Sequence, residues 1–126
     1  MKQTIVLIVL ALICSLPVIA TDKPVSGEQT ISGHLVDVAC GSQNSAKPDS
    51  NFGATHDKSC LQMDDCVKSG YGVLTSENKV IKFDSKGNEQ ARKFIQMTNK
   101  DKDWKVTVSG AVTGNTIAVN SIMLQK

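Results

Sequence analysis

The sequence predicts a mainly β domain built from five short strands and two short helices. Two observations favour this class: apolar and β-branched residues alternate in several short segments, and turns rich in glycine, asparagine or serine separate those segments. Size is the third observation. The 126 residues, less a signal of twenty residues described next, suffice for one domain with its own core.

Residues 1–20 are typical of a secretory signal peptide. Lys2 supplies the positive charge, residues 5–13 are apolar, and Ala20 is a small residue suited to cleavage. The apolar stretch is shorter than the roughly 20 residues that cross a bilayer, so we expect no membrane span after cleavage. The mature chain is therefore predicted to be exported to the periplasm or secreted, where conditions oxidise cysteines. We expect a flexible leader over residues 21–29 and one domain over 30–126.

The first strand is expected over residues 30–40. Its alternation changes face between Leu35 and Val36, which predicts a bulge or bend that Gly33 would tolerate. Residues 41–56 have no period and predict a loop.

A helix is expected over residues 60–69. Ser59 and Gln62 form a capping box at its start, and Gly70 supplies its end. This helix bears two cysteines.

The second half of the chain predicts four strands and one helix. The helix covers residues 89–97 and buries apolar side chains at helical spacing. The strands are expected over residues 71–75, 79–84, 104–113 and 116–124, with a Gly114-Asn115 turn between the last two.

This order of elements resembles the OB-fold, a small five-stranded Greek-key barrel, here with a cysteine-bearing helix after the first strand. A sandwich or an open α+β sheet is the alternative. The spacing of glycine, aspartate, cysteine and histidine is also similar to that of small exported bacterial proteins of unknown function. The residues concerned are Gly33, Asp37, Cys40, Gly41, His56, Cys60, Cys66 and Gly70. In those proteins the two helical cysteines stand closer together, and the resemblance implies no activity.

Three cysteines remain after signal cleavage, because Cys14 leaves with the signal. On one continuous helix, Cys60 and Cys66 are separated by a rise of about 9 Å and a rotation of about 120°. Disulfide-bonded Cα atoms lie within about 7 Å, so these two cannot pair unless the helix breaks. Cys40 is therefore expected to pair with one of them. We favour Cys40–Cys66, which leaves Cys60 free at the helix start, with Cys60 as the alternative partner.

A soft-metal site is the first alternative function. Met63 lies one helical turn from both cysteines of the predicted helix, and His56 precedes Cys60 by four residues. Thiolate, thioether and imidazole groups bind copper(I). One imidazole and three thiolates suit zinc, and the alternative zinc ligands are His56, Cys40, Cys60 and Cys66. The predicted ligands are His56, Cys60, Met63 and Cys40.

A thiol–disulfide redox protein is the second alternative. Cys60 lies at the expected helix start, where unpaired amides and the helix dipole favour a thiolate.

Composition and motifs argue against several other functions. A net charge of +2 and an aromatic content of 4% provide neither the basic surface nor the stacking platform of a nucleic-acid partner. We find no phosphate-binding loop, nucleophile elbow or dinucleotide fingerprint. We therefore predict a non-catalytic binding or accessory module, stabilised by one disulfide and without a cofactor, whose partner is a protein or a small ligand.

Overall fold

The computed structural model describes residues 27–47 and 49–126, which form five strands and five helices. The strands are β1 (Gln29–Asp37), β2 (Tyr71–Leu74), β3 (Val80–Phe83), β4 (Lys105–Thr113) and β5 (Thr116–Leu124). The helices are α1 (Val38–Ser45), α2 (Phe52–Thr55), α3 (Lys58–Leu61), α4 (Asp64–Ser69) and α5 (Ser85–Met97). The predicted signal peptide and most of the predicted leader lie outside the described residues.

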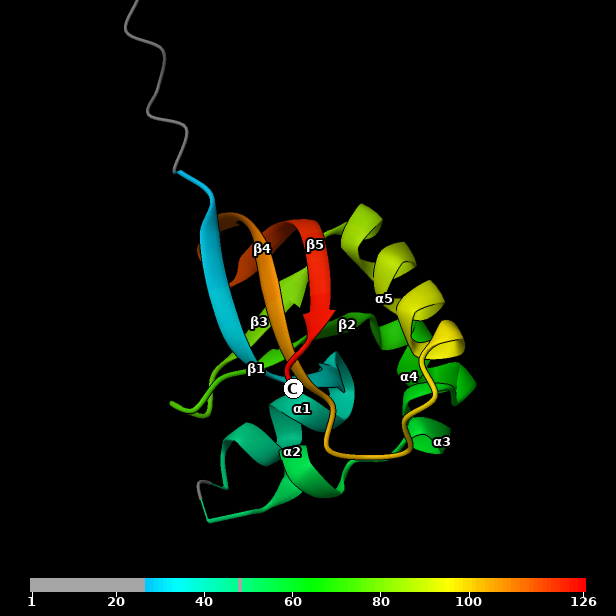
Figure 1. Ribbon diagram of the computed structural model, residues 1–126. Coiled ribbons are helices and arrows are strands. Elements are labelled where there is room, and N and C mark those ends of the chain that lie inside the picture. Colours follow the sequence, from blue (N-terminus) through cyan, green and yellow to red (C-terminus); the bar gives the residue numbers. More distant parts are fainter. Residues whose placement is uncertain (1–26, 48) are drawn as a thin grey trace, which may run out of the picture.

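The five strands form one mixed sheet in the order β1-β2-β3-β5-β4 (Figure 1). β4 returns to pair with β1, so the strand pairings close into a ring. β3 and β5 are parallel, and the other neighbours are antiparallel. β1 pairs with two strands. Its residues 29–34 pair with β4, and its residues 34–37 pair with β2. His34 is the residue at which β1 passes from one partner to the other.

The end of β1 differs from the prediction. The strand stops at Asp37, and the next three residues already belong to α1. Leu35 and Val36 are both fully buried, since one faces the core and the other lies under α1. A Cβ atom added to Gly41 of α1 would lie 2.7 Å from a methyl carbon of Val36. The change of face is thus explained by burial on both sides of the strand.

A bulge or a bend was expected in the first strand, and the register shift of the sheet shows that the bulge lies elsewhere. The pairing of β1 with β2 and with β4 is regular throughout. The shift falls between β4 and β5, at Ser109 and Gly110.

The chain between β1 and β2 is helical, which corrects two predictions. The expected loop over residues 41–56 contains most of α1 and all of α2. The expected single helix over residues 60–69 is two helices, because α3 ends at its C-cap Gln62 and the backbone of Met63 is extended. Asp57 caps α3 by accepting a 2.9 Å hydrogen bond from the amide of Cys60, so the predicted capping box is wrong. α4 ends at Gly70 as expected, with a φ of 83°.

The second half of the chain follows the prediction closely. The four strands fall within a residue or two of the expected bounds, and Gly114 adopts a positive φ in the turn between β4 and β5. α5 begins at Ser85 rather than residue 89, because Asp84 caps it by accepting a 2.8 Å hydrogen bond from the amide of Gly87.

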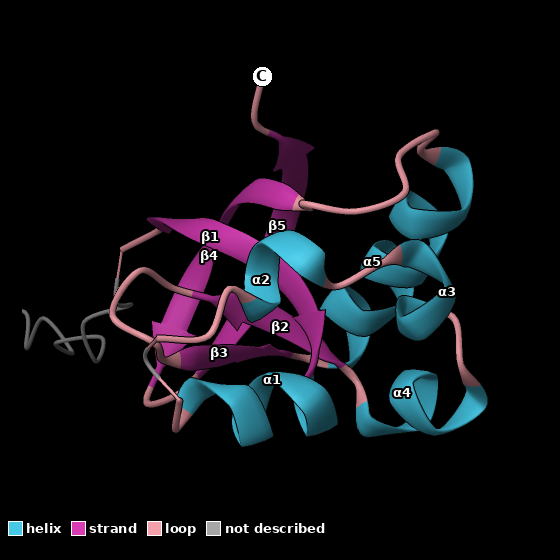
Figure 2. Ribbon diagram, turned by 90° about the horizontal axis from the view of Figure 1, so that it is seen from below, coloured by secondary structure: helices cyan, strands magenta, loops and turns pink. Residues whose placement is uncertain are grey.

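The core lies between the strands and α5. Its largest side chains are those of Trp104, Leu35, Leu61, Ile95 and Ile117, all under 2% exposed. The short helices α3 and α4 lie at the same side as α5, and α1 lies beside β3 (Figure 2). Helical and strand residues are about equal in number, so the mainly β class is only partly confirmed. No helix among the described residues is long and apolar enough to cross a membrane.

Candidate functional site

Asp37 is the centre of a buried group of polar side chains. It is the last residue of β1 and the N-cap of α1, where its Oδ2 accepts a 2.8 Å hydrogen bond from the amide of Cys40. Its side chain is 0% exposed, and a carboxylate so far from water requires hydrogen-bond partners. Because aspartate is a preferred N-cap, one residue both starts the helix and places a negative charge inside the protein.

His56 is the second partner of this carboxylate. Its Nε2 atom lies 2.9 Å from Oδ1 of Asp37, and its side chain is 3% exposed. His56 follows α2, where its amide donates a hydrogen bond to the carbonyl oxygen of Phe52. The Phe52 and His56 rings lie with their centroids 4.6 Å apart. Both oxygens of Asp37 are therefore hydrogen-bonded, one by a helix amide and one by an imidazole.

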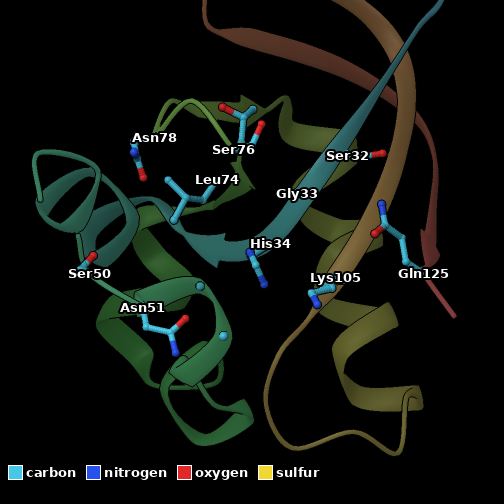
Figure 3. A pocket seen from close by; sticks show the side chains of 13 residues that line it. Ser32, Gly33, His34, Ser50, Asn51, Leu74, Ser76, Asn78, Lys105 and Gln125 are labelled. Atoms are coloured by element: carbon cyan, nitrogen blue, oxygen red, sulfur yellow. The ribbon is translucent and has the colours of Figure 1, made fainter. Parts of the chain in front are cut away.

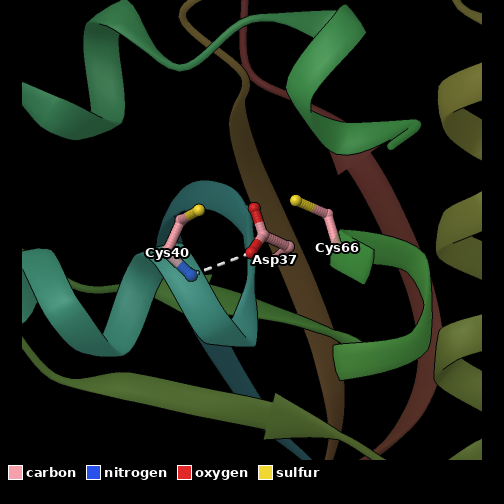
Figure 4. Close-up of side chains that lie close together, drawn as sticks. All are labelled: Asp37, Cys40 and Cys66. Carbon is pink, nitrogen blue, oxygen red and sulfur yellow. Dashed lines mark hydrogen bonds between the residues drawn. The ribbon is translucent and has the colours of Figure 1, made fainter. Parts of the chain in front are cut away.

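Cys40 and Cys66 meet at Asp37 from two different helices (Figure 4). Both sulfur atoms and an oxygen of Asp37 lie within 4.8 Å of one another, and the two cysteines approach to 4.2 Å. Packing of α1 against α4 produces this meeting. The cysteines among the described residues are free thiols. We refer to Asp37, Cys40 and Cys66 as the Asp–Cys–Cys cluster.

The cluster holds its acidic groups in opposite protonation states. Burial raises the pKa of Asp37, but hydrogen bonds from His56 and from the Cys40 amide outweigh it and leave this pKa below its usual value. Burial, assisted by the nearby charge of Asp37, raises the pKa of Cys66 to about 12. The same two causes raise the pKa of Cys40. At neutral pH an ionised carboxylate thus lies beside two neutral thiols.

The metal ligands predicted from the sequence are only partly brought together. Cys40 belongs to the cluster, and His56 contacts it through Asp37. Cys60 is near enough to raise the pKa of Cys40, but its sulfur lies outside the group of atoms within 4.8 Å. Met63 is 56% exposed and precedes α4.

Cys60 lacks the surroundings of a reactive thiolate. α3 has only four residues, and the amide of Cys60 is already bonded to Asp57. Burial, together with the charge of Asp57, raises the pKa of Cys60. This environment favours the thiol over the thiolate that we expected at a helix start.

Asp37 is central to the candidate site but was not predicted from the sequence as a site residue. The signal was present, because an aspartate that ends an apolar segment three residues before a cysteine fits an N-cap. Asp37 was not recognised as an N-cap because the first strand was predicted to continue to Cys40. The argument that kept Cys60 and Cys66 apart also assumed a continuous helix, which the structure does not contain.

A second candidate site is a cleft of about 360 Å³ where β1, α2 and the β2–β3 turn meet (Figure 3). We refer to it as the polar cleft. Its polar lining consists of Ser32, His34, Ser50, Asn51, Thr75, Ser76, Asn78, Lys105 and Gln125.

His34 lines this cleft between the carboxylate of Asp103 and helix α2. Its Nε2 atom is 3.0 Å from Oδ1 of Asp103, whose other oxygen lies 3.7 Å from Nζ of Lys105. The hydrogen bond from His34 lowers the pKa of Asp103. On its other side, the ring packs so close to Gly53 of α2 that a Cβ atom there would lie 2.6 Å from the imidazole. The glycine therefore lets α2 form one wall of the cleft.

Comparisons with protein-family models, with curated proteins and with solved structures found no match. The geometry of the two sites is therefore the basis for assigning a function.

Proposed function

We propose that this chain is a small exported, non-catalytic binding module whose ligand site is the polar cleft. The cleft itself supports this proposal, because hydrogen-bonding side chains from several segments converge on one concavity. Its volume of about 360 Å³ is within the usual range for sites that hold small molecules.

The chemistry of the lining defines the class of ligand. Hydroxyl and amide side chains predominate, and Lys105 provides the formal positive charge of the lining. We infer a small, hydroxyl-rich molecule that bears an anionic group, such as a sugar phosphate. The hydroxyls of the ligand would bond to Asn51 and its neighbours, and the anion would lie towards Lys105.

The order of the strands supports an OB-like Greek-key barrel, in which the first strand pairs with both of its neighbours. In OB-folds, ligands bind beside the connection between the first two strands. α2 belongs to that connection and forms a wall of the polar cleft. By analogy of fold, the polar cleft therefore lies where OB-folds bind ligands.

Amide chemical shifts would test the ligand site. We expect glucose 6-phosphate, added to the ¹⁵N-labelled protein, to shift the amides of Gly33, His34 and Gly53. Lys105→Ala should weaken this binding by about tenfold, which corresponds to about 1.4 kcal/mol. Lys93→Ala, at an exposed position of α5, is the matched control, and this variant should bind the ligand as the parent does. Glucose and inorganic phosphate separate the two halves of the ligand, and the absence of shifts at these amides with all three probes would contradict the proposal.

We further propose that a Cys40–Cys66 disulfide stabilises the exported protein. Cys40 and Cys66 approach to 4.2 Å. Rotation of their side chains can bring the two sulfurs to bonding distance, which supports this pair over a pair with Cys60. Closing this loop would stabilise the fold by about 3 kcal/mol. Non-reducing peptide mapping of protein secreted through an oxidising compartment should recover a linked Cys40–Cys66 peptide. A Cys40–Cys60 peptide would contradict this pairing.

A further inference from the structure

We propose that, in the reduced protein, the Asp–Cys–Cys cluster is a zinc site. Its ligands would be the sulfur atoms of Cys40 and Cys66 and an oxygen of Asp37, with His56 as a positioning residue. The inference is independent of the polar cleft, which has different residues.

The donor atoms already have nearly the required spacing. Around tetrahedral zinc, with bonds of about 2.0–2.3 Å, donor atoms lie about 3.5–3.8 Å apart. The two sulfurs and the oxygen of the cluster all lie within 4.8 Å of one another. Each pair must therefore close by no more than about 1.3 Å, a change that side-chain rotation can supply without moving α1 against α4.

The charges favour a divalent cation. Asp37 is fully buried with both carboxylate oxygens hydrogen-bonded, and Cys66 is only 7% exposed. Two thiolates beside this carboxylate would bring three negative charges together out of water, which is very unfavourable without a cation. Zinc would offset two of these charges, and its binding would release the two thiol protons to solvent.

The donor set points to zinc rather than to copper(I) or calcium. Two thiolates with one carboxylate combine soft and hard donors, which a borderline ion such as zinc accepts. Copper(I) prefers thiolate, thioether and imidazole donors to a hard carboxylate, and Met63 is exposed and outside the cluster. Calcium prefers six or more oxygen ligands, and the cluster has one carboxylate.

His56 is suited to hold the carboxylate in place. Its 2.9 Å hydrogen bond to Oδ1 fixes the orientation of Asp37, and the ring of Phe52 packs against the imidazole. Hydrogen bonds to metal ligands of this kind typically change affinity by about 10–100-fold.

Zinc and the Cys40–Cys66 disulfide use the same two sulfurs, so each excludes the other. Only the dithiol form of the protein would bind zinc. This exclusion lets the two proposals be tested separately, one on the oxidised protein and one on the reduced protein.

The experiment titrates the reduced mature protein with zinc in competition with a chromophoric chelator. We expect one zinc ion per chain, and a loss of affinity of at least about 100-fold in Cys40→Ser and in Cys66→Ser. Cys60→Ser and Met63→Leu are the matched controls and should bind zinc as the parent does. The disulfide form should bind no zinc at this site.

Cobalt(II) provides a second measurement that does not depend on affinity alone. Its thiolate charge-transfer band should correspond to two sulfur ligands in the parent and to one in either Cys40→Ser or Cys66→Ser. Asp37→Asn should weaken binding and leave the band of two thiolates. His56→Gln should lower affinity by about tenfold with the band unchanged, since it acts through Asp37.

Three results would overturn the zinc site. The first is a reduced, folded parent protein that binds no stoichiometric zinc. The second is a loss of affinity in Cys60→Ser as large as in Cys40→Ser. The third is tight binding of copper(I) that depends on Met63. Circular dichroism of each metal-free variant separates loss of ligands from loss of fold.

Discussion

The protein contains two histidine–aspartate pairs with almost the same geometry and very different surroundings. His56 and Asp37 lie 2.9 Å apart, and their side chains are 3% and 0% exposed. His34 and Asp103 lie 3.0 Å apart, and their side chains are 25% and 39% exposed. Distance alone would assign the two pairs equal importance. Burial distinguishes the two pairs. Water cannot replace a lost hydrogen bond to the buried carboxylate of Asp37, whereas it can hydrogen-bond to the side chains of the exposed pair.

The difference assigns the two pairs to different tasks. The buried pair joins the end of β1, the start of α1 and the end of α2, so it holds the connection between β1 and β2 in place. In the exposed pair, His34 lines the polar cleft, where we propose that a ligand binds. Four substitutions test this comparison.

Asp37→Ala should have the largest effect. It leaves the imidazole of His56 and the amide of Cys40 without an acceptor inside the protein, and breaking a buried pair costs about 3–5 kcal/mol. Urea denaturation measures this loss as a change in the free energy of unfolding. Asp57→Ala is the matched control, because Asp57 caps α3 in the same manner from a more exposed position and should have a clearly smaller effect. Equal losses in both variants would show that capping, rather than burial of the pair, explains the role of Asp37.

The sequence analysis succeeded where one period continues over a whole element. Buried residues alternate with less buried ones along most of β4 and in the first half of β5, and α5 presents one apolar face. β4 and β5 appear in the structure within one residue of their predicted bounds, and α5 has four additional residues at its start. Each is stabilised by burial of a repeated pattern, which is visible without knowledge of the partners.

The chain between β1 and β2 could not be predicted in this way. α1 to α4 have between four and eight residues, too few for a helical period to emerge from the sequence. Asp37 and Asp57 cap α1 and α3, whereas the N-cap residues of α2 and α4 make no side-chain cap hydrogen bond. The positions of the helices depend on contacts with distant elements. Lys58, for example, donates its amide to the carbonyl oxygen of Asp101 and its Nζ to that of Thr98.

The candidate site was predicted only in part for the same reason. The sequence analysis identified Cys40 and Cys66 as the favoured pair and His56 as a nearby ligand. It did not identify Asp37, which bonds to the histidine and brings the two regions together. A buried carboxylate is recognised from its partners, and those partners come from elements that the sequence analysis had assigned to a strand and a loop.

Gly53→Ala should have the next largest effect, at the exposed pair. The added Cβ atom would lie 2.6 Å from the ring of His34, so α2 or the imidazole must move. Overpacking of this kind typically costs about 1–3 kcal/mol, and the hydrogen bond from His34 to Asp103 should weaken with it. Thermal denaturation and the chemical shifts of the His34 ring measure the two effects.

Gly27→Ala is the control for this substitution. A Cβ atom at Gly27 meets no other atom within 4 Å, so this variant should unfold as the parent does. If Gly53→Ala also behaved as the parent, α2 would not be fixed against His34, and the cleft would lack the wall that we assign to it.

His34→Gln should have a smaller effect on stability than either of these changes. A partly exposed pair of this kind contributes less than about 1 kcal/mol, because water replaces the lost partner. His56→Gln is the matched substitution in the buried pair and should destabilise the protein several times more in the same urea experiment. Similar losses in the two variants would contradict the separation of the pairs by burial.

Asp103→Asn should have the smallest effect, and that effect should depend on pH. The hydrogen bond from His34 lowers the pKa of Asp103, so its contribution is present above the unfolded value of about 3.8. As the pH falls through the lower pKa of the folded state, the carboxylate is protonated and the contribution is lost. The stability difference between parent and variant should therefore shrink below about pH 4.

Salt should also reduce this difference, because Asp103 and its partner are within reach of solvent. Urea denaturation at several pH values and two ionic strengths measures both dependences. A difference that persists unchanged at low pH would show that the contact with His34 does not require an ionised carboxylate. The exposed pair would then be held by packing against Gly53 and its neighbours, and its contrast with the buried pair would rest on shape rather than on charge.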